Sequence, residues 1–265
     1  MQIGFLILLF ILGACIGSFL CCSARRLHFR QAEHRSLGKR SVCLSCHHQL
    51  KWYDNLPIIS WILLKGKCRK CHQKIGLAEF LSEVGTAFAF VALGATIDIE
   101  TAGLLAWLTF ASTVMLAIVL IFLAIFDGLY GELPTLFLIL AIICGFVILI
   151  LKECLFFTLY PLSELIWQPI LSTLILGGLY LVLYLISKGK WVGDGDWLLG
   201  TAIGLALFNP WLAVITLFVS NTLAFFVMYP KSKKNRRFKI YFGPFLVVAF
   251  IIVCSLSDQL LSLIP

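Results

Sequence analysis

Charged residues are scarce in this chain. Only 13% of its 265 residues are Asp, Glu, Lys or Arg, whereas 61% are hydrophobic and the mean hydropathy is +1.00. A soluble domain of this length needs far more polar surface to cover its core. Repeated apolar runs of about 20 residues are instead what a bilayer requires. The composition therefore argues against a soluble protein and predicts a polytopic membrane protein.

Several further patterns are missing as well. The sequence has no series of short alternating strands, which argues against a membrane β-barrel. It has no glycine-rich strand-turn-helix fingerprint of a soluble dinucleotide-binding domain. It shows no convincing internal repeat of the kind that many transporters carry. Because lipid cannot satisfy free backbone groups, the apolar runs are expected to be α-helices.

About eight such runs can be traced, and they predict an all-α fold. They cover residues 2–24, 77–97, 103–126, 134–151, 168–187, 196–208, 211–229 and 242–263. The first run begins Met-Gln-Ile-Gly without a basic residue, and its arginines, Arg25 and Arg26, follow it. We therefore interpret it as a retained span with its N-terminus outside, and not as a cleavable signal peptide.

The basic residues support this topology. With eight crossings and the N-terminus outside, the C-terminus is also outside, and segments 25–76, 127–133, 188–195 and 230–241 are cytoplasmic. These segments hold 20 of the 21 Lys and Arg residues. Lys and Arg in short loops favour the cytoplasmic side, so the separation indicates a multi-pass protein of the cytoplasmic membrane. The formal charge of +8 then reflects membrane orientation and anionic lipid, and no nucleic-acid partner is expected.

Four cysteines in the longest polar segment are spaced for metal binding. Cys43 and Cys46 form one C-x-x-C pair, and Cys68 and Cys71 form another. Two such pairs can supply the four thiolates of a closed structural zinc site. Disulfides would also fit the spacing, but they rarely persist in the reducing cytoplasm. A redox-active pair or a cluster without metal would fit it too, and the nearby His47, His48 and His72 are interpreted as solvated loop residues.

The sequence thus predicts three regions. Residues 1–24 form the first transmembrane helix, and residues 25–76 form a small cytoplasmic, zinc-ribbon-like insertion between the first two helices. Residues 77–265 form the remaining transmembrane core.

Two aspartates are expected at the cytoplasmic ends of their helices. Asp127 ends the third run and Asp196 begins the sixth, so both lie at similar membrane depth. An ionisable group within a span costs about 2.5–3.5 kcal/mol and marks a functional site by default. Two carboxyl groups in a small space can share one proton and act as general base and general acid. Gly193 and Gly195 have no side chains and would let a substrate backbone approach. The competing interpretation is that the aspartates are interfacial or helix-capping residues.

The ordered set of motifs resembles the type IV prepilin peptidase family, also called prepilin leader peptidase/N-methyltransferases. These enzymes are similar to other intramembrane aspartyl proteases with a Gly-x-Gly-Asp motif. The resemblance runs through "GSFL" (17–20), the cysteine pairs and "WYDNLPIISWILLKGKC" (52–68), and then through Glu83 and Asp127 with Pro134. It ends with "GDGD" (193–196) and "YFGPFL" (241–246). The family usually has Asn-Val after "GSFL", where this chain has Cys21-Cys22.

The resemblance implies that Asp127 and Asp196 are the catalytic pair and that Asp194 does not act. It implies cleavage of type IV prepilins or pseudopilins after a glycine at the cytoplasmic face, with membrane lipid as a further contact. It also implies N-methylation of the new terminus with S-adenosylmethionine, for which the residues show no binding site. The competing functions are a cleavage-only peptidase, a noncatalytic zinc-ribbon scaffold and a transporter.

Overall fold

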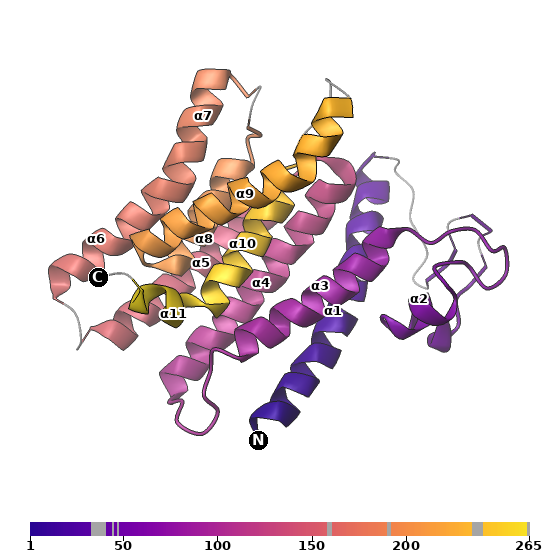
Figure 1. The fold of residues 1–265 in the computed structure, drawn as a ribbon, viewed down its shortest axis with the longest axis horizontal. Helices are drawn as coiled ribbons and strands as arrows, with labels where there is room; N and C mark the ends of the chain where they lie inside the picture. The colour runs from indigo at the N-terminus through magenta and orange to yellow at the C-terminus, as the bar shows by residue number, and fades with distance from the viewer. Residues whose placement is uncertain are drawn as a thin grey trace. The chain divides into compact units, whose positions relative to one another are not determined.

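The computed structural model describes residues 1–32, 41–43, 45–46, 48–157, 161–189, 192–234 and 241–263. Within these residues the secondary structure is helical, apart from two isolated β-bridges. The chain divides into two compact units, Met1–Val91 and Ala92–Pro265, whose elements can be followed in Figure 1. The all-α fold expected from the apolar runs is confirmed.

Six helical segments are long and apolar enough to cross a membrane. They are Gln2–Phe29, Leu77–Gly94, Leu104–Tyr130, Thr135–Phe156, Leu162–Ser187 and Pro210–Met228. Of two shorter apolar helices, α8 (Asp196–Leu207) matches the predicted run 196–208, whereas α10 (Gly243–Ser255) covers only the first part of the predicted run 242–263, which continues as α11 (Ser257–Ser262). That about eight helices cross the bilayer stays a prediction. The fifth run is longer than expected, because α6 (Leu162–Thr173) begins after Pro161 and continues through η2 (Leu174–Gly178) into α7 (Leu179–Ser187).

In the first unit, α1 (Gln2–Ala32) packs closely on the part of α3 (Leu77–Gly94) that belongs to the same unit. Gly13 and Gly17 make this approach possible, because a Cβ atom at either position would lie 2.8 Å or less from α3 backbone. Small residues four apart are a common device for bringing membrane helices together. Between these helices in the sequence lie the cysteine pairs, the short helix η1 (Trp52–Asn55) and α2 (Ile59–Leu63).

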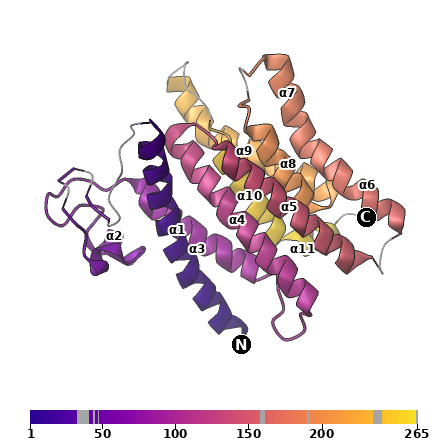
Figure 2. The same ribbon diagram turned by 180° about the vertical axis from the view of Figure 1, so that it is seen from behind.

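The second unit is built around α8. This helix contacts α5 (Thr135–Phe156), α6, η2, α7, α9 (Pro210–Lys234) and α10, and its residues Leu199, Ala202 and Ile203 have no exposed surface. Gly200 and Gly204 let it lie directly against the backbone of the α6–η2 segment, as Figures 1 and 2 illustrate. A helix of 12 residues is only about 18 Å long, but it is enclosed by protein on its sides.

A lysine stabilises the far end of α8. The ammonium of Lys152 on α5 donates hydrogen bonds to the carbonyl oxygens of Ala206 (2.7 Å) and Leu207 (3.5 Å). These carbonyls belong to the last turn of α8, where intrahelical partners run out and a cation is favoured. Lys152, the one basic residue outside the predicted cytoplasmic segments, therefore has a structural explanation.

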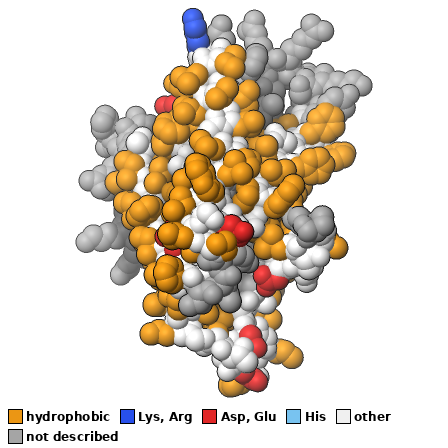
Figure 3. Space-filling view, turned by 90° about the vertical axis from the view of Figure 1, so that its left-hand side faces the viewer, with side chains coloured by type: hydrophobic (Ala, Val, Ile, Leu, Met, Phe, Trp, Pro, Cys, Tyr) orange, Lys and Arg blue, Asp and Glu red, His pale blue; other side chains and the backbone are white. Residues whose placement is uncertain are grey.

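The face over α6 and α7 is dominated by hydrophobic side chains, as Figure 3 shows. Its exposed members include Leu162, Trp167, Ile170, Leu174 and Ile186. Large apolar side chains that face outward along a helix are expected where the surroundings are lipid. The surface thus agrees with the membrane location inferred from composition.

Candidate functional site

Asp127 lies in the last turn of α4 (Leu104–Tyr130) and is only 6% exposed. Its carboxylate Oδ2 accepts a hydrogen bond of 3.0 Å from the backbone N–H of Gly243, the first residue of α10. A carboxylate is disfavoured at the C-terminal end of its own helix but favoured at the N-terminus of another. The start of α10 therefore holds Asp127 in place.

Asp196 is the first residue of α8 and is 8% exposed. Its Oδ2 accepts a 2.9 Å hydrogen bond from the backbone N–H of Gly193, which precedes the helix. The N-cap of α8 is Gly195, which makes no side-chain capping hydrogen bond. The carboxylate is thus turned toward the preceding loop, and a helix-capping role for Asp196 finds no support in these contacts. Asp194, by contrast, is exposed.

Packing between aromatic side chains and helices of the second unit links the surroundings of Asp127 to those of Asp196. Phe242, which precedes the glycine bonded to Asp127, packs its ring 5.2 Å from that of Tyr180 on α7. Helix α7, which carries Tyr180, contacts α8, the helix that Asp196 begins. Both carboxyl groups therefore belong to the end of the unit where α4 and α7 finish and where α8 and α10 start.

The two motif glycines play different parts. A Cβ at Gly195 would lie 2.7 Å from Leu133 Cδ1 and would also approach Leu138, so this glycine lets α8 pack against the start of α5. Gly193 is exposed, and the first atom its Cβ would meet is Oδ2 of Asp196, at 3.4 Å. Space for an approaching backbone therefore exists at Gly193, whereas Gly195 is covered by leucine side chains.

The four predicted metal ligands are gathered in the first unit. The sulfur atoms of Cys43, Cys46, Cys68 and Cys71 all lie within 4.8 Å of one another. The Cys43 and Cys71 sulfurs are 3.8 Å apart, far longer than a disulfide bond of about 2.05 Å. A tetrahedral ion with metal–sulfur bonds of about 2.3 Å needs sulfurs roughly 3.8 Å apart. The cluster could therefore hold a metal ion.

The backbone explains why the four sulfurs converge. One isolated antiparallel bridge joins Val42 to Gln49 around the first cysteine pair, and another joins Lys67 to Lys74 around the second. The two cysteine pairs therefore lie in two turns of the same form. In each turn, one bridge residue directly precedes the first cysteine, and its partner lies three residues after the second cysteine. His72 follows the second pair with a positive φ of 55°. His47 lies outside the described residues.

Backbone donors also prepare one thiol for metal binding. The N–H groups of Cys71 and Lys70 point at the sulfur of Cys68 and lower its pKa to about 7. Thiolate is the form that binds metals, so these donors favour the ligating state.

Gly243 lies within the "YFGPFL" motif (241–246), but the sequence assigned it no role in the site. Its partner Asp127 is 116 residues away along the chain, so no local pattern could reveal the contact. The available signal was Pro244 just after it, since proline in the first turn marks the start of a helix.

The fold and these two clusters define an all-helical membrane protein with buried aspartates at helix ends and a four-cysteine cluster. Residues 11–97 match the family model described as the bacterial peptidase A24 N-terminal domain. The chain is 28% identical to a prepilin leader peptidase/N-methyltransferase of Vibrio cholerae, over 96% of this chain and 97% of the relative. It is 40% identical to one from Myxococcus xanthus over 88 residues, which are 33% of this chain and 25% of the relative.

A relative of the same name from Aeromonas salmonicida is 28% identical over 96% of this chain and 91% of its own length. No solved structure matches the chain. The chain is thus similar over nearly its whole length to proteins named prepilin leader peptidase/N-methyltransferase.

Proposed function

We propose that this protein is a membrane-embedded aspartic endopeptidase that removes the leader peptides of type IV prepilins or pseudopilins. Asp127 and Asp196 are the catalytic pair. The observation that carries this proposal is that both carboxyl groups are buried at the same end of one unit, each held by a backbone N–H. Relatives that match nearly the whole chain are named for prepilin leader cleavage and N-methylation.

The reaction needs one carboxylate and one carboxylic acid. The carboxylate takes a proton from water, whose oxygen attacks the carbonyl carbon of the scissile peptide, while the acid protonates the carbonyl oxygen. When the tetrahedral intermediate collapses, the carbon–nitrogen bond breaks and the amine leaves with a proton. The N–H groups of Gly243 and Gly193 each donate a hydrogen bond to one oxygen of their aspartate and so hold the carboxyl group in position.

The second reaction proposed is N-methylation of the amine that cleavage releases. S-adenosylmethionine would supply an electrophilic methyl group on a sulfonium. It would serve as the methyl donor for the amine that cleavage releases, and the nitrogen would give up a proton in exchange for the methyl group. A cleavage-only peptidase is the second candidate.

The four cysteines are proposed to bind one structural Zn²⁺. Zinc fits because four thiolates complete its tetrahedral shell and leave no open position for catalysis. The ion would join the two knuckles, defined as Val42–Gln49 and Lys67–Lys74.

The proposed orientation places both termini outside and the cysteine segment and the catalytic pair on the cytoplasmic side. In the second unit, exposed Lys188 ends α7 at the end that carries the aspartates, while Glu164 begins α6 at the opposite end. Positive charge on the cytoplasmic side agrees with this arrangement. Membrane lipid is expected around the exposed apolar helices.

The test is the replacement of each catalytic acid by its amide. Asp127→Asn and Asp196→Asn keep the shape of the side chain but cannot hold or release the proton. We expect each variant to lose cleavage of a purified prepilin by at least about a hundredfold. Asp194→Asn, at the exposed neighbouring acid, is the matched control and should cleave normally. Cleavage by either catalytic variant at the rate of this control would refute the proposal.

A further inference from the structure

The short helix α2 carries apolar side chains on both of its sides. On the inner side Ser60 is buried, and the ring of Trp61 stacks on that of Phe80 in α3, with centroids 4.5 Å apart. Three outward side chains, here called the α2 outer face, are each more than half exposed: Ile59, Ile62 and Leu63. Because positions i, i+3 and i+4 lie on one side of a helix, these side chains form one apolar surface. A helix that is hydrophobic all round is normally covered all round.

This apolar surface extends beyond the helix itself. Trp52, the first residue of η1, is 76% exposed, and Leu56, shortly before α2, is 40% exposed. Exposed apolar side chains that are scattered singly are ordinary, but a group of them in one short segment marks an interaction surface.

A hydrogen bond to α3 fixes the depth of α2. Ile58, the N-cap of α2, donates through its N–H to Oε2 of Glu83 over 2.7 Å. Helix α3 begins at Leu77, so Glu83 lies about 9 Å along its axis at 1.5 Å per residue. The start of α2 therefore lies beside a helix long and apolar enough to cross the membrane, and not beyond its end.

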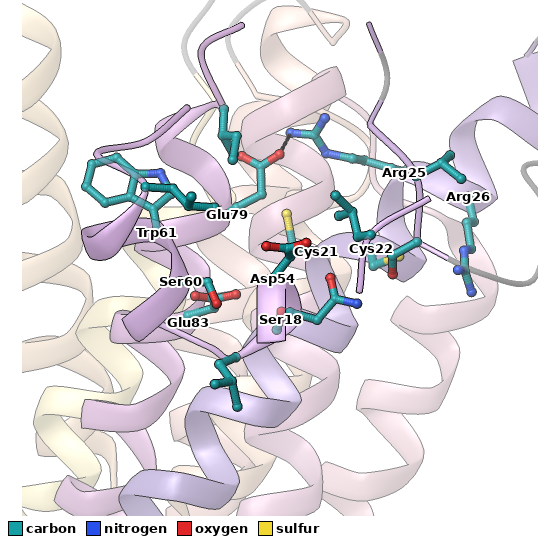
Figure 4. Close-up of a pocket in the computed structure, with 17 residues that line it drawn as sticks. Ser18, Cys21, Cys22, Arg25, Arg26, Asp54, Ser60, Trp61, Glu79 and Glu83 are labelled. Carbon is teal, nitrogen blue, oxygen red and sulfur yellow. Dashed lines mark ion pairs between the residues drawn. The ribbon is translucent and has the colours of Figure 1, made fainter. Parts of the chain in front are cut away.

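Helix α1 indicates the same depth. Ser18 of α1 lines one pocket of the first unit together with Ser60 and Glu83, and Figure 4 shows all three. The apolar run of α1 ends at Arg25, which follows Ser18 by seven residues, or about 10 Å of helix. Interfacial helices bury their apolar face to a depth of about 5–10 Å in the headgroup and acyl boundary. Helix α2 therefore lies at a depth where its outer face can meet lipid.

The charge around the segment complements an anionic leaflet. Residues 51–76 contain six basic residues and a single acid, Asp54, which is paired with Arg69 at 2.8 Å. The five remaining basic residues are all exposed lysines: Lys51, Lys65, Lys67, Lys70 and Lys74. Two of them directly flank the apolar stretch, one before Trp52 and one after α2. Anionic headgroups attract basic side chains placed in this way.

We propose that residues 52–64 insert as an interfacial element into the leaflet that borders the cytoplasm. The α2 outer face lies among the acyl chains near the headgroups, and the flanking lysines contact anionic phospholipid. The partner of this surface is thus an anionic bilayer, which holds the two knuckles on either side of the segment at the membrane. The inference goes beyond the proposed peptidase activity and does not depend on it.

The first experiment labels the purified full-length chain from the lipid. The protein is placed in nanodiscs with phosphatidylglycerol that carries a diazirine in an acyl chain, and light-induced adducts are mapped by peptide mass spectrometry. We expect adducts on the α2 outer face within about threefold of those on Phe19, an exposed side chain of α1. Gln73, exposed in the second knuckle, should carry few. Adducts on Phe19 with none on the α2 outer face would overturn the proposal.

The second experiment places a charge on the outer face. Leu63 is 75% exposed, so Leu63→Glu leaves the packing of α2 on α3 intact while its carboxylate is excluded from the acyl chains. We expect adducts on Ile59 and Ile62 to fall at least about fivefold. Gln73→Glu adds the same charge at an exposed position of the second knuckle and is the matched control, which should label like wild type. Equal labelling of both variants would count against insertion.

The third experiment distinguishes lipid from protein as the cover of this face. Photoreactive benzoylphenylalanine at position 63, in the same nanodiscs, should form adducts with phosphatidylglycerol. Capture of peptides from residues 92–265 would show that the second unit covers the face, and cross-linked dimers would show that a second copy of the chain does. Either result would overturn the proposal.

Discussion

Asp127 is a carboxyl group at the unfavourable end of its own helix, and one backbone N–H from another helix compensates for this. The donor, Gly243, has no side chain for a steric reason: a Cβ there would lie 2.8 Å from Asp127 Oδ2. Gly243 is not among the residues with positive φ, so alanine would fit its backbone. Glycine is therefore needed at this position to leave room for the Asp127 carboxylate, and not to allow an unusual backbone conformation.

Because the backbone at residue 243 accepts alanine, Gly243→Ala tests the contact with the Asp127 carboxylate and not the fold of the chain. The added methyl group should push the Asp127 carboxylate out of position and remove a charge-assisted hydrogen bond, lowering prepilin cleavage about 10- to 100-fold. The thermal midpoint in detergent should change little. Cleavage rates of purified variants against one prepilin provide the measurement.

Gly128→Ala is the matched control, since its Cβ would meet only Pro244 Cγ at 3.7 Å, an ordinary contact. If Gly243→Ala cleaves as fast as Gly128→Ala, the N–H of residue 243 does not position Asp127.

At the level of elements, the two knuckles are short turns. Among the described residues their backbone hydrogen bonds include those from Cys43 N–H to the His48 carbonyl and from Cys68 N–H to the Gln73 carbonyl, both 2.9 Å. Small elements of this kind usually depend on a bound metal for their stability. The metal should therefore couple the knuckles to each other.

Metal removal tests this dependence. Purified protein should contain about one zinc per chain, and Cys43→Ser or Cys68→Ser should release it. Cys154→Ser, which alters an exposed cysteine outside the cluster, should retain it. Elemental analysis gives the metal content, and limited proteolysis of residues 41–75 shows whether the knuckles open. Metal-free protein with unchanged proteolysis would contradict a structural role.

The sequence predicts elements better than it predicts contacts between them. Hydropathy located the apolar helices because each signal lies within one continuous run, and the cysteine spacing located the four-cysteine cluster because each pair is local. The hydrogen bond from Gly243 to Asp127 could not be predicted, because the two residues lie in different helices far apart in the sequence. The role of Lys152 escaped because sequence shows its charge but not the carbonyls of α8 that it meets.

At the scale of the whole molecule, the distribution of charge predicts which side of the membrane each polar segment occupies. Cys154, near the end of α5, is exposed and should lie outside, whereas exposed Lys51 in the cysteine segment should lie inside.

A membrane-impermeant maleimide can distinguish these positions, because it reaches only the outer surface of intact spheroplasts. The thiol introduced by Lys51→Cys should react only after the membrane is broken, and Cys154 should react in both preparations. Site-resolved mass spectrometry gives the labelled fraction at each position. Labelling of position 51 in intact spheroplasts, with Cys154 protected until lysis, would reverse the orientation and place the proposed catalytic pair on the wrong side for a cytoplasmic cleavage.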